Sequence, residues 1–426
     1  AKLSADAGAG GISVLESDGL VIGDVTVSVD RVDAAGGTGA VDTTHSGATT
    51  ILGGSIVVQT IAGSLTVASG VAASGGAAAV RLGAGGPDSD VSIDNGVVSS
   101  GPITIIAVDS VMQNANITAG GTVDVLATNG SIDMAADTTT STAGDSISYV
   151  AAVNATIESL DAGAGEIAVV ATSGSIIDGD IQVDLIAAGL LLTAGNVIGA
   201  AGDPIETSVA SLSAVSAGVY IVETDGLTVT EITVIVNRVD GSGQTSPVEL
   251  KQADIETTAG GPVILGGGDG TLHVTDGDSD GSGIEASGPI LLWTENVVRS
   301  GGEDIILDAE VRSAGGPITI NAAGSVMQNA DVLSVANDID VSAAVDIIMS
   351  DGARTFSDGG NVRYVAGNSI VVGSIDAGAG TIGLFADTIR DGGDTHTDVM
   401  AAAALFNAVT GIGVVGIATG ALEVDA

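Results

Sequence analysis

The chain has no cysteine, only 7 prolines, and few aromatic residues, which make up 2% of the sequence. The absence of cysteine excludes a disulfide framework, a thiolate zinc site and thiol chemistry. Basic residues are scarce as well: 10 Lys and Arg stand against 53 Asp and Glu, so the formal net charge is −43. This charge repels phosphate backbones and anionic membrane surfaces, and we therefore expect no nucleic acid partner.

Aliphatic residues and glycine dominate what is present. Hydrophobic residues make up 45% of the 426 residues, and 65 residues are Gly. The mean hydropathy of +0.50 is too high for a disordered chain. β-Branched residues recur in short runs separated by Gly, Asp, Ser and Asn, a pattern typical of many short strands. No 3.6-residue apolar stripe persists and Gly recurs every few residues, which argues against helices.

The sequence repeats itself at long range. "GISVLESDGLVIGDVTVSVDRVD" from Gly11 matches "GVYIVETDGLTVTEITVIVNRVD" from Gly218, a shift of 207. "GPITIIAVDSVMQNANI" from Gly101 matches "GPITINAAGSVMQNADV" from Gly316, a shift of 215. We place two long repeats of about 210 residues at 1–209 and 210–426, the second continuous with the first. Because both ends lie in phase with the repeat, we expect a segment of a longer array.

A shorter period lies inside each long repeat. Strand-like runs begin near Ile103, Val123, Ile147, Ile167 and Leu190, at spacings of about 20–24 residues. A strand, a helix and a return strand would need about 30 residues. The spacing instead suits one coil of a β-helix that lays two or three strands on the coil below. We predict an all-β fold, a parallel and right-handed β-helix or β-solenoid with coils of about 20–24 residues.

Two segments carry a resemblance to a known family. "GPITINAAGSVMQNADV" and "LLLTAGNVIGAAGDPIETSVASLSA" resemble the long β-strand repeats of filamentous-haemagglutinin-like giant surface proteins of bacteria. The resemblance covers almost the whole chain and concerns architecture. It implies a right-handed β-helical shaft, secretion to the cell surface, and a role in adhesion, cell contact or extracellular filaments. It does not supply a ligand, because a shared fold does not imply a shared function.

One acidic loop is a candidate metal site. Asp276, Asp278 and Asp280, followed by Gly281, reproduce the first half of a calcium loop. Hard oxygen ligands at alternate positions can converge on one cation where Gly allows a sharp turn. The twelfth position is Ser287 and not a bidentate Glu, so an acidic loop without metal is the alternative. Calcium is the one cofactor that the sequence suggests.

The hexapeptide "SVMQNA" occurs from Ser110 and again, letter for letter, from Ser325. One interpretation puts its Gln and Asn in a groove that holds sugar hydroxyls. The other puts them in a tight turn or in a ladder of stacked amides. We favour the second interpretation, because the two copies lie inside a longer matching stretch and duplication alone explains their preservation.

The sequence gives little support for catalysis. His45, His273 and His396 lie in unlike contexts and do not recur in phase, so neither a zinc site nor a Ser-His-Asp arrangement is indicated. Enzymes that cut polysaccharides combine clustered carboxylates with cationic residues and an aromatic-lined groove. This chain has one tryptophan, Trp293. We therefore predict that it is not an enzyme.

One apolar stretch has the length of a membrane span. The sequence from Met400 to Leu422 carries no charged residue, and a stretch of this length can cross a bilayer. It aligns with the segment from Leu185, whose copy carries an Asp, a Pro and a Glu. We therefore predict that this stretch does not insert into a membrane.

Three functions are compatible with these features. The first is a structural shaft segment of a very long extracellular surface or filament-forming protein, serving as rigid spacer and scaffold in cell contact. Its partners would be neighbouring copies of the same protein, end to end or side by side. The second is an adhesin whose solenoid faces bind glycans, another cell surface or neighbouring shafts directly. The third, with the least support, is a secreted polysaccharide lyase or hydrolase. All three place the chain outside the bacterial cell or on its surface.

Overall fold

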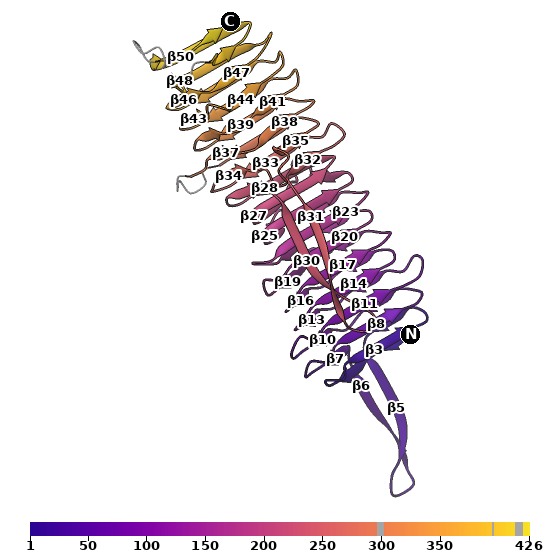
Figure 1. Cartoon of the computed structure of the whole chain (residues 1–426). Coiled ribbons are helices and arrows are strands. Elements are labelled where there is room, and N and C mark those ends of the chain that lie inside the picture. The colour runs from indigo at the N-terminus through magenta and orange to yellow at the C-terminus, as the bar shows by residue number, and fades with distance from the viewer. Residues whose placement is uncertain (296–301, 394–395, 414–420) are drawn as a thin grey trace. The chain divides into compact units, whose positions relative to one another are not determined.

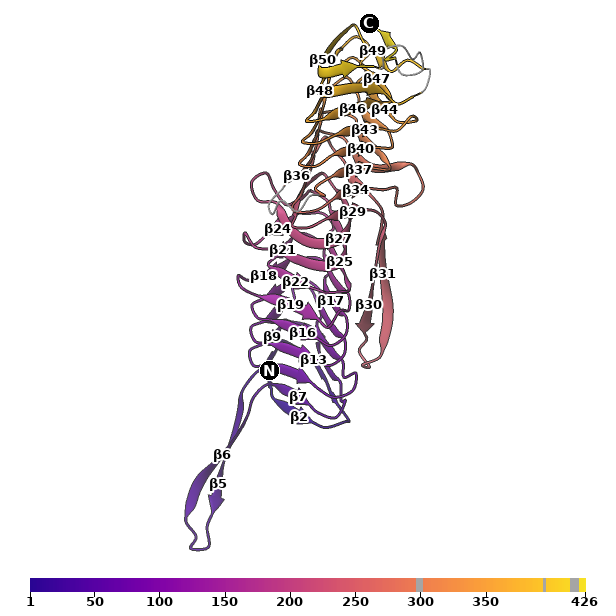
Figure 2. The same ribbon diagram turned by 90° about the vertical axis from the view of Figure 1, so that its left-hand side faces the viewer.

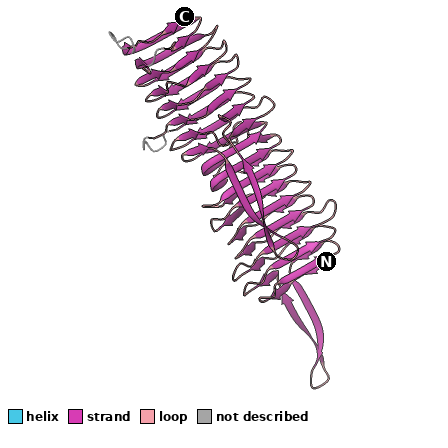
Figure 3. Ribbon diagram, in the orientation of Figure 1, coloured by secondary structure: helices cyan, strands magenta, loops and turns pink. Residues whose placement is uncertain are grey.

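The computed structural model describes residues 1–295, 302–393, 396–413 and 421–426. Within these residues every regular element is a β-strand and there is no helix (Figure 3). Parallel strands are stacked in about 18 coils, which makes the fold a β-solenoid and confirms the predicted class. A helix that could span a membrane is absent from the described part of the chain. Residues 414–420 of the uncharged stretch lie outside the described residues.

The chain divides into two compact units. Unit 1 contains Ala1–Ala187 and Val234–Leu250, and unit 2 contains Ala188–Thr233 and Lys251–Ala426. The units are defined by contacts, whereas the long repeats are defined by sequence. The predicted repeat boundary at 209/210 falls within strand β27 (Ile205–Ser216).

One coil of unit 1 shows how the solenoid is built. β14 (Ile103–Ala107), β15 (Val111–Gln113) and β16 (Ile117–Ala119) form the coil, and β17 (Val123–Ala127) begins the next one. β17 lies parallel to β14, with Ile103 opposite Val123. Because each strand pairs with the strand three positions later, the coils stack into three parallel sheets (Figure 1). The expected spacing is confirmed here, since these two strands begin at the two predicted positions.

The strands of unit 1 fall into these three sheets. The first sheet contains β3 (Ile12–Glu16), β8 (Ile56–Thr60), β11 (Val80–Ala84), β14, β17, β20 (Ile147–Ala151) and β23 (Glu166–Ala171). The second contains β1 (Lys2–Leu3), β4 (Leu20–Ile22), β9 (Leu65–Val67), β12 (Val91–Ile93), β15, β18 (Ile132–Met134), β21 (Ala155–Ile157) and β24 (Ile176–Asp178). The third contains β2 (Ala5–Ala7), β7 (Ala48–Thr50), β10 (Val71–Ala73), β13 (Val97–Ser99), β16, β19 (Thr139–Thr142) and β22 (Ser159–Asp161).

Unit 2 repeats the plan. After β25 (Leu185–Ala194), β26 (Val197–Ile198) and β27, its first sheet contains β28 (Gly218–Glu223), β33 (Val263–Gly267), β36 (Ile290–Thr294), β39 (Ile318–Ala322), β42 (Ile339–Ala343), β45 (Val362–Ala366), β48 (Thr381–Asp391) and β50 (Ala403–Ile412). The second contains β29 (Leu227–Val229), β34 (Leu272–Val274), β37 (Ile305–Leu307), β40 (Val326–Gln328), β43 (Ile347–Met349) and β46 (Ser369–Val372). The third contains β32 (Ile255–Thr257), β35 (Ser282–Ala286), β38 (Glu310–Ser313), β41 (Val332–Ser334), β44 (Arg354–Phe356), β47 (Ser374–Asp376), β49 (Val399–Met400) and β51 (Val424–Asp425).

The core consists of aliphatic ladders. Alternate residues of each strand point inward, so one residue type stacks on the next along the coils. Ile103, Val123, Ile147 and Ile167 occupy successive rungs of the first sheet, and all four are fully buried. Such ladders fill the interior without aromatic residues, which explains how a chain with so few of them has a core.

Two antiparallel hairpins leave the coils. β5 (Val25–Val32) pairs with β6 (Thr38–His45), and β30 (Ile232–Val239) pairs with β31 (Thr245–Gln252) (Figure 2). They occupy matching places in the two long repeats. Their turns are alike: Gly36 and Gly243 adopt φ of 81° and 80°, a conformation that favours glycine. The sequence reasoning did not foresee either hairpin.

Candidate functional site

The predicted calcium loop lies in unit 2, between β34 and β35. Asp276, Asp278 and Asp280 gather there, and Asp254 joins them from the coil before. One carboxylate oxygen from each of the four lies within 4.8 Å of the others. A set of carboxylate oxygens at this separation has the chemistry that Ca²⁺ prefers. The sequence did not predict Asp254 as a member of this cluster, because only the stacking of coils brings it to the loop.

Backbone amides hold the loop in shape. The amide of Ser279 donates to Oδ1 of Asp276 at 2.6 Å, and the amide of Gly281 donates to Oδ2 of the same carboxylate at 2.9 Å. The amide of Gly277 donates to Oδ1 of Asp254 at 2.8 Å. These bonds orient the carboxylates, and a bound cation would compete with them for some of the same oxygens.

Protons compete for this cluster as well. Burial raises the pKa of Asp254 to about 6, and the nearby carboxylates of Asp278, Asp276 and Asp280 contribute to this rise. The backbone bond from Gly277 acts in the opposite direction. Because a carboxylate must be ionised to bind Ca²⁺, cation binding here would release protons around and below pH 6.

Two further clusters, each of three acidic residues, also bring one carboxylate oxygen from each member within 4.8 Å of the others. Burial raises the pKa of Asp398 to about 7, with smaller contributions from its neighbours. Acidic groups of this kind are expected on a chain with a net charge of −43, so proximity alone does not make them metal sites. The two groups are Asp178, Asp180 and Asp184 in unit 1, and Asp391, Asp398 and Glu423 in unit 2.

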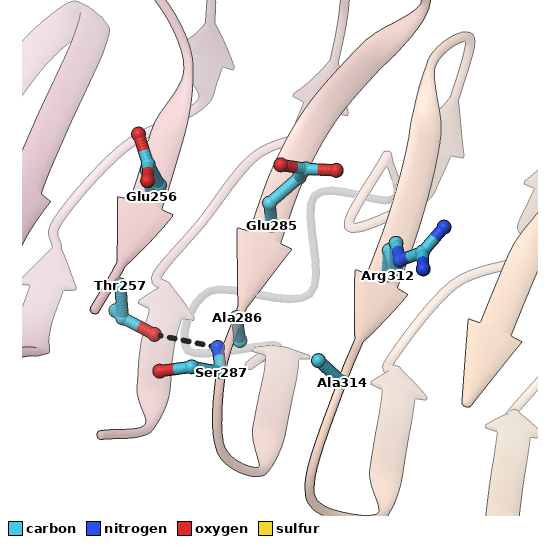
Figure 4. Close-up of a pocket in the computed structure, with 7 residues that line it drawn as sticks. All are labelled: Glu256, Thr257, Glu285, Ala286, Ser287, Arg312 and Ala314. Atoms are coloured by element: carbon cyan, nitrogen blue, oxygen red, sulfur yellow. Dashed lines mark hydrogen bonds between the residues drawn. The ribbon is translucent and has the colours of Figure 1, made fainter. Parts of the chain in front are cut away.

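A shallow pocket lies on the third sheet of unit 2 (Figure 4). Glu256, Glu285 and Arg312 line it from matching positions of β32, β35 and β38. Ser287, the twelfth position of the calcium pattern, lines this pocket too, and its amide donates to Oγ1 of Thr257 at 3.2 Å. Two acids and one arginine resemble part of a polysaccharide-cleaving site. The described lining contains no aromatic residue, so it offers no stacking surface for a sugar ring.

The repeated "SVMQNA" forms a strand whose Gln points into the core. Gln113 on β15 is fully buried, and its Oε1 accepts a hydrogen bond from the hydroxyl of Tyr149 at 2.6 Å. Oγ1 of Thr140 lies 2.6 Å from the same hydroxyl. Gln328, Thr355 and Tyr364 repeat this buried network in unit 2. The sugar-groove interpretation is therefore wrong for the Gln, because its amide faces the interior in both copies.

The Asn of the hexapeptide is exposed and links successive coils. Asn114 donates to Oδ1 of Asp94 at 2.7 Å, and Asn329 donates to Oδ1 of Asp308 at 2.7 Å. The expected ladder therefore runs between an amide and a carboxylate, and not between stacked amides. Asp308 also lies 2.7 Å from Nε2 of His273, and these two bonds lower its pKa.

The other two histidines also lie beside single aspartates. Nδ1 of His45 is 2.7 Å from Oδ2 of Asp6, and Nδ1 of His396 is 3.9 Å from Oδ1 of Asp351. The three histidines lie on different coils, each with an aspartate as its neighbour. In the described part of the chain no cluster that could hold a metal includes a histidine.

Hairpin β30–β31 packs on the first sheet of unit 1 through apolar side chains. Val234, Val236 and Val239 are fully buried there. The amide of Val239 donates to Oγ1 of Thr104 at 2.9 Å, and the amide of Asn237 donates to Oγ1 of Thr122 at 2.8 Å. Burying a valine side chain contributes on the order of 1.5–3 kcal/mol. Burial of the three valines is therefore the main contribution to the stability of the docked hairpin.

A charged pair fixes the register of the docked hairpin. Arg238 binds Asp124 through two hydrogen bonds, of 2.6 Å and 3.0 Å, and the Asp124 side chain is fully buried. This hydrogen bonding raises the pKa of Arg238. Nη1 of Arg81 donates to the carbonyl oxygen of Val239 at 2.6 Å. The hairpin therefore recognises its sheet by shape, by backbone bonds and by charge.

Hairpin β5–β6 has the same sequence pattern in different surroundings. Its Val27, Val29 and Val32 align with the three buried valines, yet they are exposed by 58%, 55% and 67%. Arg31 aligns with Arg238 and is exposed as well. Every residue of both strands except Val25 is exposed.

An apolar hollow lies on the first sheet of unit 2. Its lining includes Tyr220 from β28, Ile264 from β33 and Trp293 from β36. A Cβ atom on Gly266 would overlap the indole, so a glycine is required for Trp293 to lie over this position. The hollow places two aromatic side chains at the surface of a chain that has few of them.

No family model matches the chain, and no curated protein and no solved structure matches it. The class that the structure defines is the parallel β-solenoid. Any function has to be inferred from the residues of this chain.

Proposed function

We propose that the chain is a structural shaft segment of a very long extracellular surface or filament-forming protein, serving as rigid spacer and scaffold in cell contact. One observation carries the proposal: the two units repeat the same interior, including the buried Gln, Thr and Tyr network. Repetition of a core provides length and stiffness, whereas a catalytic centre needs only one copy. The resemblance to filamentous-haemagglutinin-like repeats supports an extracellular place.

The coil structure supports a mechanical role. Each coil is bonded to the next through backbone hydrogen bonds on three sides, and adjacent strands in a sheet lie about 4.8 Å apart. Added coils therefore add length without adding a new kind of contact. The net charge of −43 keeps such segments soluble and apart from anionic surfaces.

Electron microscopy of the purified chain tests the proposal. We expect thin, straight particles, and labelling of the source cells with an antibody should mark their outer surface. Compact globular particles, or labelling confined to the cell interior, would contradict the shaft function.

A second candidate function is direct adhesion to glycans, and the apolar hollow with Tyr220 and Trp293 favours it. Aromatic rings bind the apolar faces of sugars by stacking. A glycan array should then show binding that Trp293→Ala abolishes and that an equivalent change on another sheet, Phe356→Ala, leaves intact. The absence of binding on the array would remove this candidate.

We propose no catalytic activity for the chain. The described pocket with Glu256, Glu285 and Arg312 is the arrangement closest to a polysaccharide-cleaving site, and it is shallow and lacks aromatic lining. Turnover of any acidic polysaccharide in a broad panel, lost in Glu285→Gln, would overturn this part of the proposal.

A further inference from the structure

Hairpin β5–β6 presents an apolar face that its twin buries. The twin, β30–β31, is bound to unit 1 through Val234, Val236 and Val239, and these residues match Val27, Val29 and Val32. The turns also match, because Asp33 and Asp240 accept hydrogen bonds from the same two amides of their turns. The exposed hairpin therefore repeats the turn, the arginine and the three valines of its docked twin.

Unit 2 carries a face equivalent to the one that binds the twin. In unit 1 the binding strands are β8, β11, β14 and β17, with Thr104 opposite Asp124. In unit 2 the matching strands are β33, β36, β39 and β42, with Thr319 opposite Asp340. The Thr and Asp pair that binds the backbone and the arginine of the twin is thus present twice. In unit 1 both side chains are fully buried, whereas in unit 2 both are partly exposed.

We propose that β5–β6 of one chain docks on the first sheet of unit 2 in a second copy, over β33, β36, β39 and β42. The contact is head to tail, because it joins different surfaces of the two copies and can be repeated indefinitely. This inference rests on the proposed shaft function. It identifies the end-to-end partner of the shaft as a second copy of the same chain.

The twin's contacts assign the register of the docked hairpin. Arg31 binds Asp340, and the amide of Val32 donates to the hydroxyl of Thr319, as Arg238 and Val239 do with Asp124 and Thr104. The three exposed valines cover the sheet between these contacts.

The tip of the hairpin meets the apolar hollow of unit 2. In unit 1 a Cβ atom on Gly241 would lie 3.1 Å from the Gln59 amide, a close approach that a glycine avoids. The first hairpin has Ala34 at this place, and the position of Gln59 is taken in unit 2 by Gly266 under Trp293. The methyl group of Ala34 contacts the indole, which explains a surface tryptophan at the end of the docking face.

Two differences between the faces weaken the contact. Arg81 binds the carbonyl oxygen of Val239 in unit 1, and its place in unit 2 is taken by Leu291. The second difference concerns Asp340. Asp340 is paired with Arg363 at 2.8 Å and 3.1 Å, whereas the residue opposite Asp124 in unit 1 is Ser148. The side chains of Asp340 and Arg363 are 42% and 56% exposed, and such exposed pairs contribute little. Arg31 therefore shares the carboxylate with Arg363, and the contact between chains is weaker than the docking within a chain.

Sedimentation velocity over a range of concentrations tests the proposal. We expect the whole chain to form dimers and longer oligomers as its concentration rises. Arg31→Glu removes the hairpin's charge contact, and Asp340→Arg removes that of the face. Each variant alone should associate roughly tenfold more weakly or worse. Both positions are at least partly exposed, so folding should be retained and is checked by circular dichroism.

Mixing the two variants gives the sharper result. The Asp340→Arg chain keeps a working hairpin and the Arg31→Glu chain keeps a working face. Their two altered surfaces carry opposite charges and also fit each other, so an equimolar mixture should regain oligomers in which the two chains alternate. A chain carrying both changes should form oligomers again, because the charges are exchanged. Arg363→Ser recreates the arrangement of unit 1 and should tighten association.

Arg390→Glu is the control for Arg31→Glu, because it makes the same change in charge at an exposed position of unit 2 outside the proposed face. A chain that stays monomeric at all concentrations, or association that Arg31→Glu and Asp340→Arg leave unchanged, overturns the docking proposal. Trp293→Ala removes the indole that Ala34 contacts and should weaken association, and unchanged association in this variant would overturn the contact made by the hairpin tip. Rods seen by microscopy alongside either result would leave the shaft function standing, so the two failures are distinguishable.

Discussion

At the scale of single residues, the inward orientation of Gln113 could have been predicted from the sequence, although we did not predict it. Alternate residues of a strand share a face, so Val111 and Gln113 had to point the same way, with Met112 opposite. The structure shows both of them buried and Met112 partly exposed. The partner could not be read from the sequence, because Tyr149 reaches Gln113 only through the stacking of coils.

The network predicts a measurable cost of removing one hydroxyl. Tyr149→Phe deletes the donor to Gln113 and leaves Oε1 with Thr140 as its remaining donor. We expect the free energy of unfolding to fall by about 1–3 kcal/mol, as for other buried hydrogen bonds. Chemical denaturation followed by circular dichroism measures it. Tyr364→Phe is the matched change in unit 2 and should cost a similar amount; a cost near zero for both would show that the networks do not stabilise the fold.

The raised pKa of Asp254 predicts that this carboxyl group destabilises the folded chain as the pH rises. Its pKa in the folded chain is about 6, raised from an ordinary value near 3.8, so the folded state holds the proton more tightly than the unfolded state. The stabilisation from this group is therefore fully present below pH 3.8 and is lost as pH rises through 6. Asp254→Asn should be more stable than the parent at pH 8, and the difference should shrink towards pH 4.

Thermal melts between pH 4 and pH 8, with a chelator present, measure this difference. Asp308→Asn is the control of opposite sign, because hydrogen bonds from Asn329 and His273 lower the pKa of Asp308. That variant should be less stable than the parent at neutral pH and approach it in acid. A constant difference between Asp254→Asn and the parent across the range would contradict the assignment.

At the scale of elements, the strands could be predicted and the hairpins could not. A spacing of about 20–24 residues and an apolar alternation determine a coil, and both are local in the sequence. A hairpin such as β30–β31 differs from a coil in what it packs against, and its contacts with Thr104 and Asp124 join residues more than 100 positions apart. The motif "RVD" occurs in both hairpins, and nothing local in it indicates that Arg238 pairs with the buried Asp124.

The two hairpins provide a matched pair for measuring docking. Arg238→Ala leaves the Asp124 carboxylate covered and without its guanidinium, which should cost about 2–4 kcal/mol unless the hairpin detaches first. Hydrogen exchange at the amides of Val239 and Asn237, which donate to the sheet, reports either outcome as faster exchange. Arg31→Ala, measured in dilute solution, should leave the same amides unchanged. Equal protection in all three proteins would show that the arginine does not hold the hairpin.

At the scale of the whole molecule, the composition determines the net charge, and the structure shows which acidic residues lie close together. A net charge of −43 predicts self-repulsion, which salt screens over a Debye length that falls from about 30 Å at 0.01 M to about 8 Å at 0.15 M. The sequence also contained three of the four acids that gather at the acidic loop. It could not supply Asp254, because the alternating pattern describes one loop and not the coil beneath it.

Charge screening and specific binding predict different responses to calcium. Sodium chloride should raise the melting temperature of the chain by screening alone. At equal ionic strength and pH 7.5, about 5 mM CaCl₂ should raise it further, because a site with a dissociation constant of about 0.1–1 mM then adds roughly 1–2 kcal/mol to the folded state. The double variant Asp254→Asn and Asp276→Asn should lose this additional stabilisation and keep the response to sodium.

Asp18→Asn with Asp42→Asn removes the same charge from exposed positions of unit 1 and should keep both responses. If calcium and sodium act alike at equal ionic strength in the parent chain, the acidic loop is a solvated surface and not a metal site.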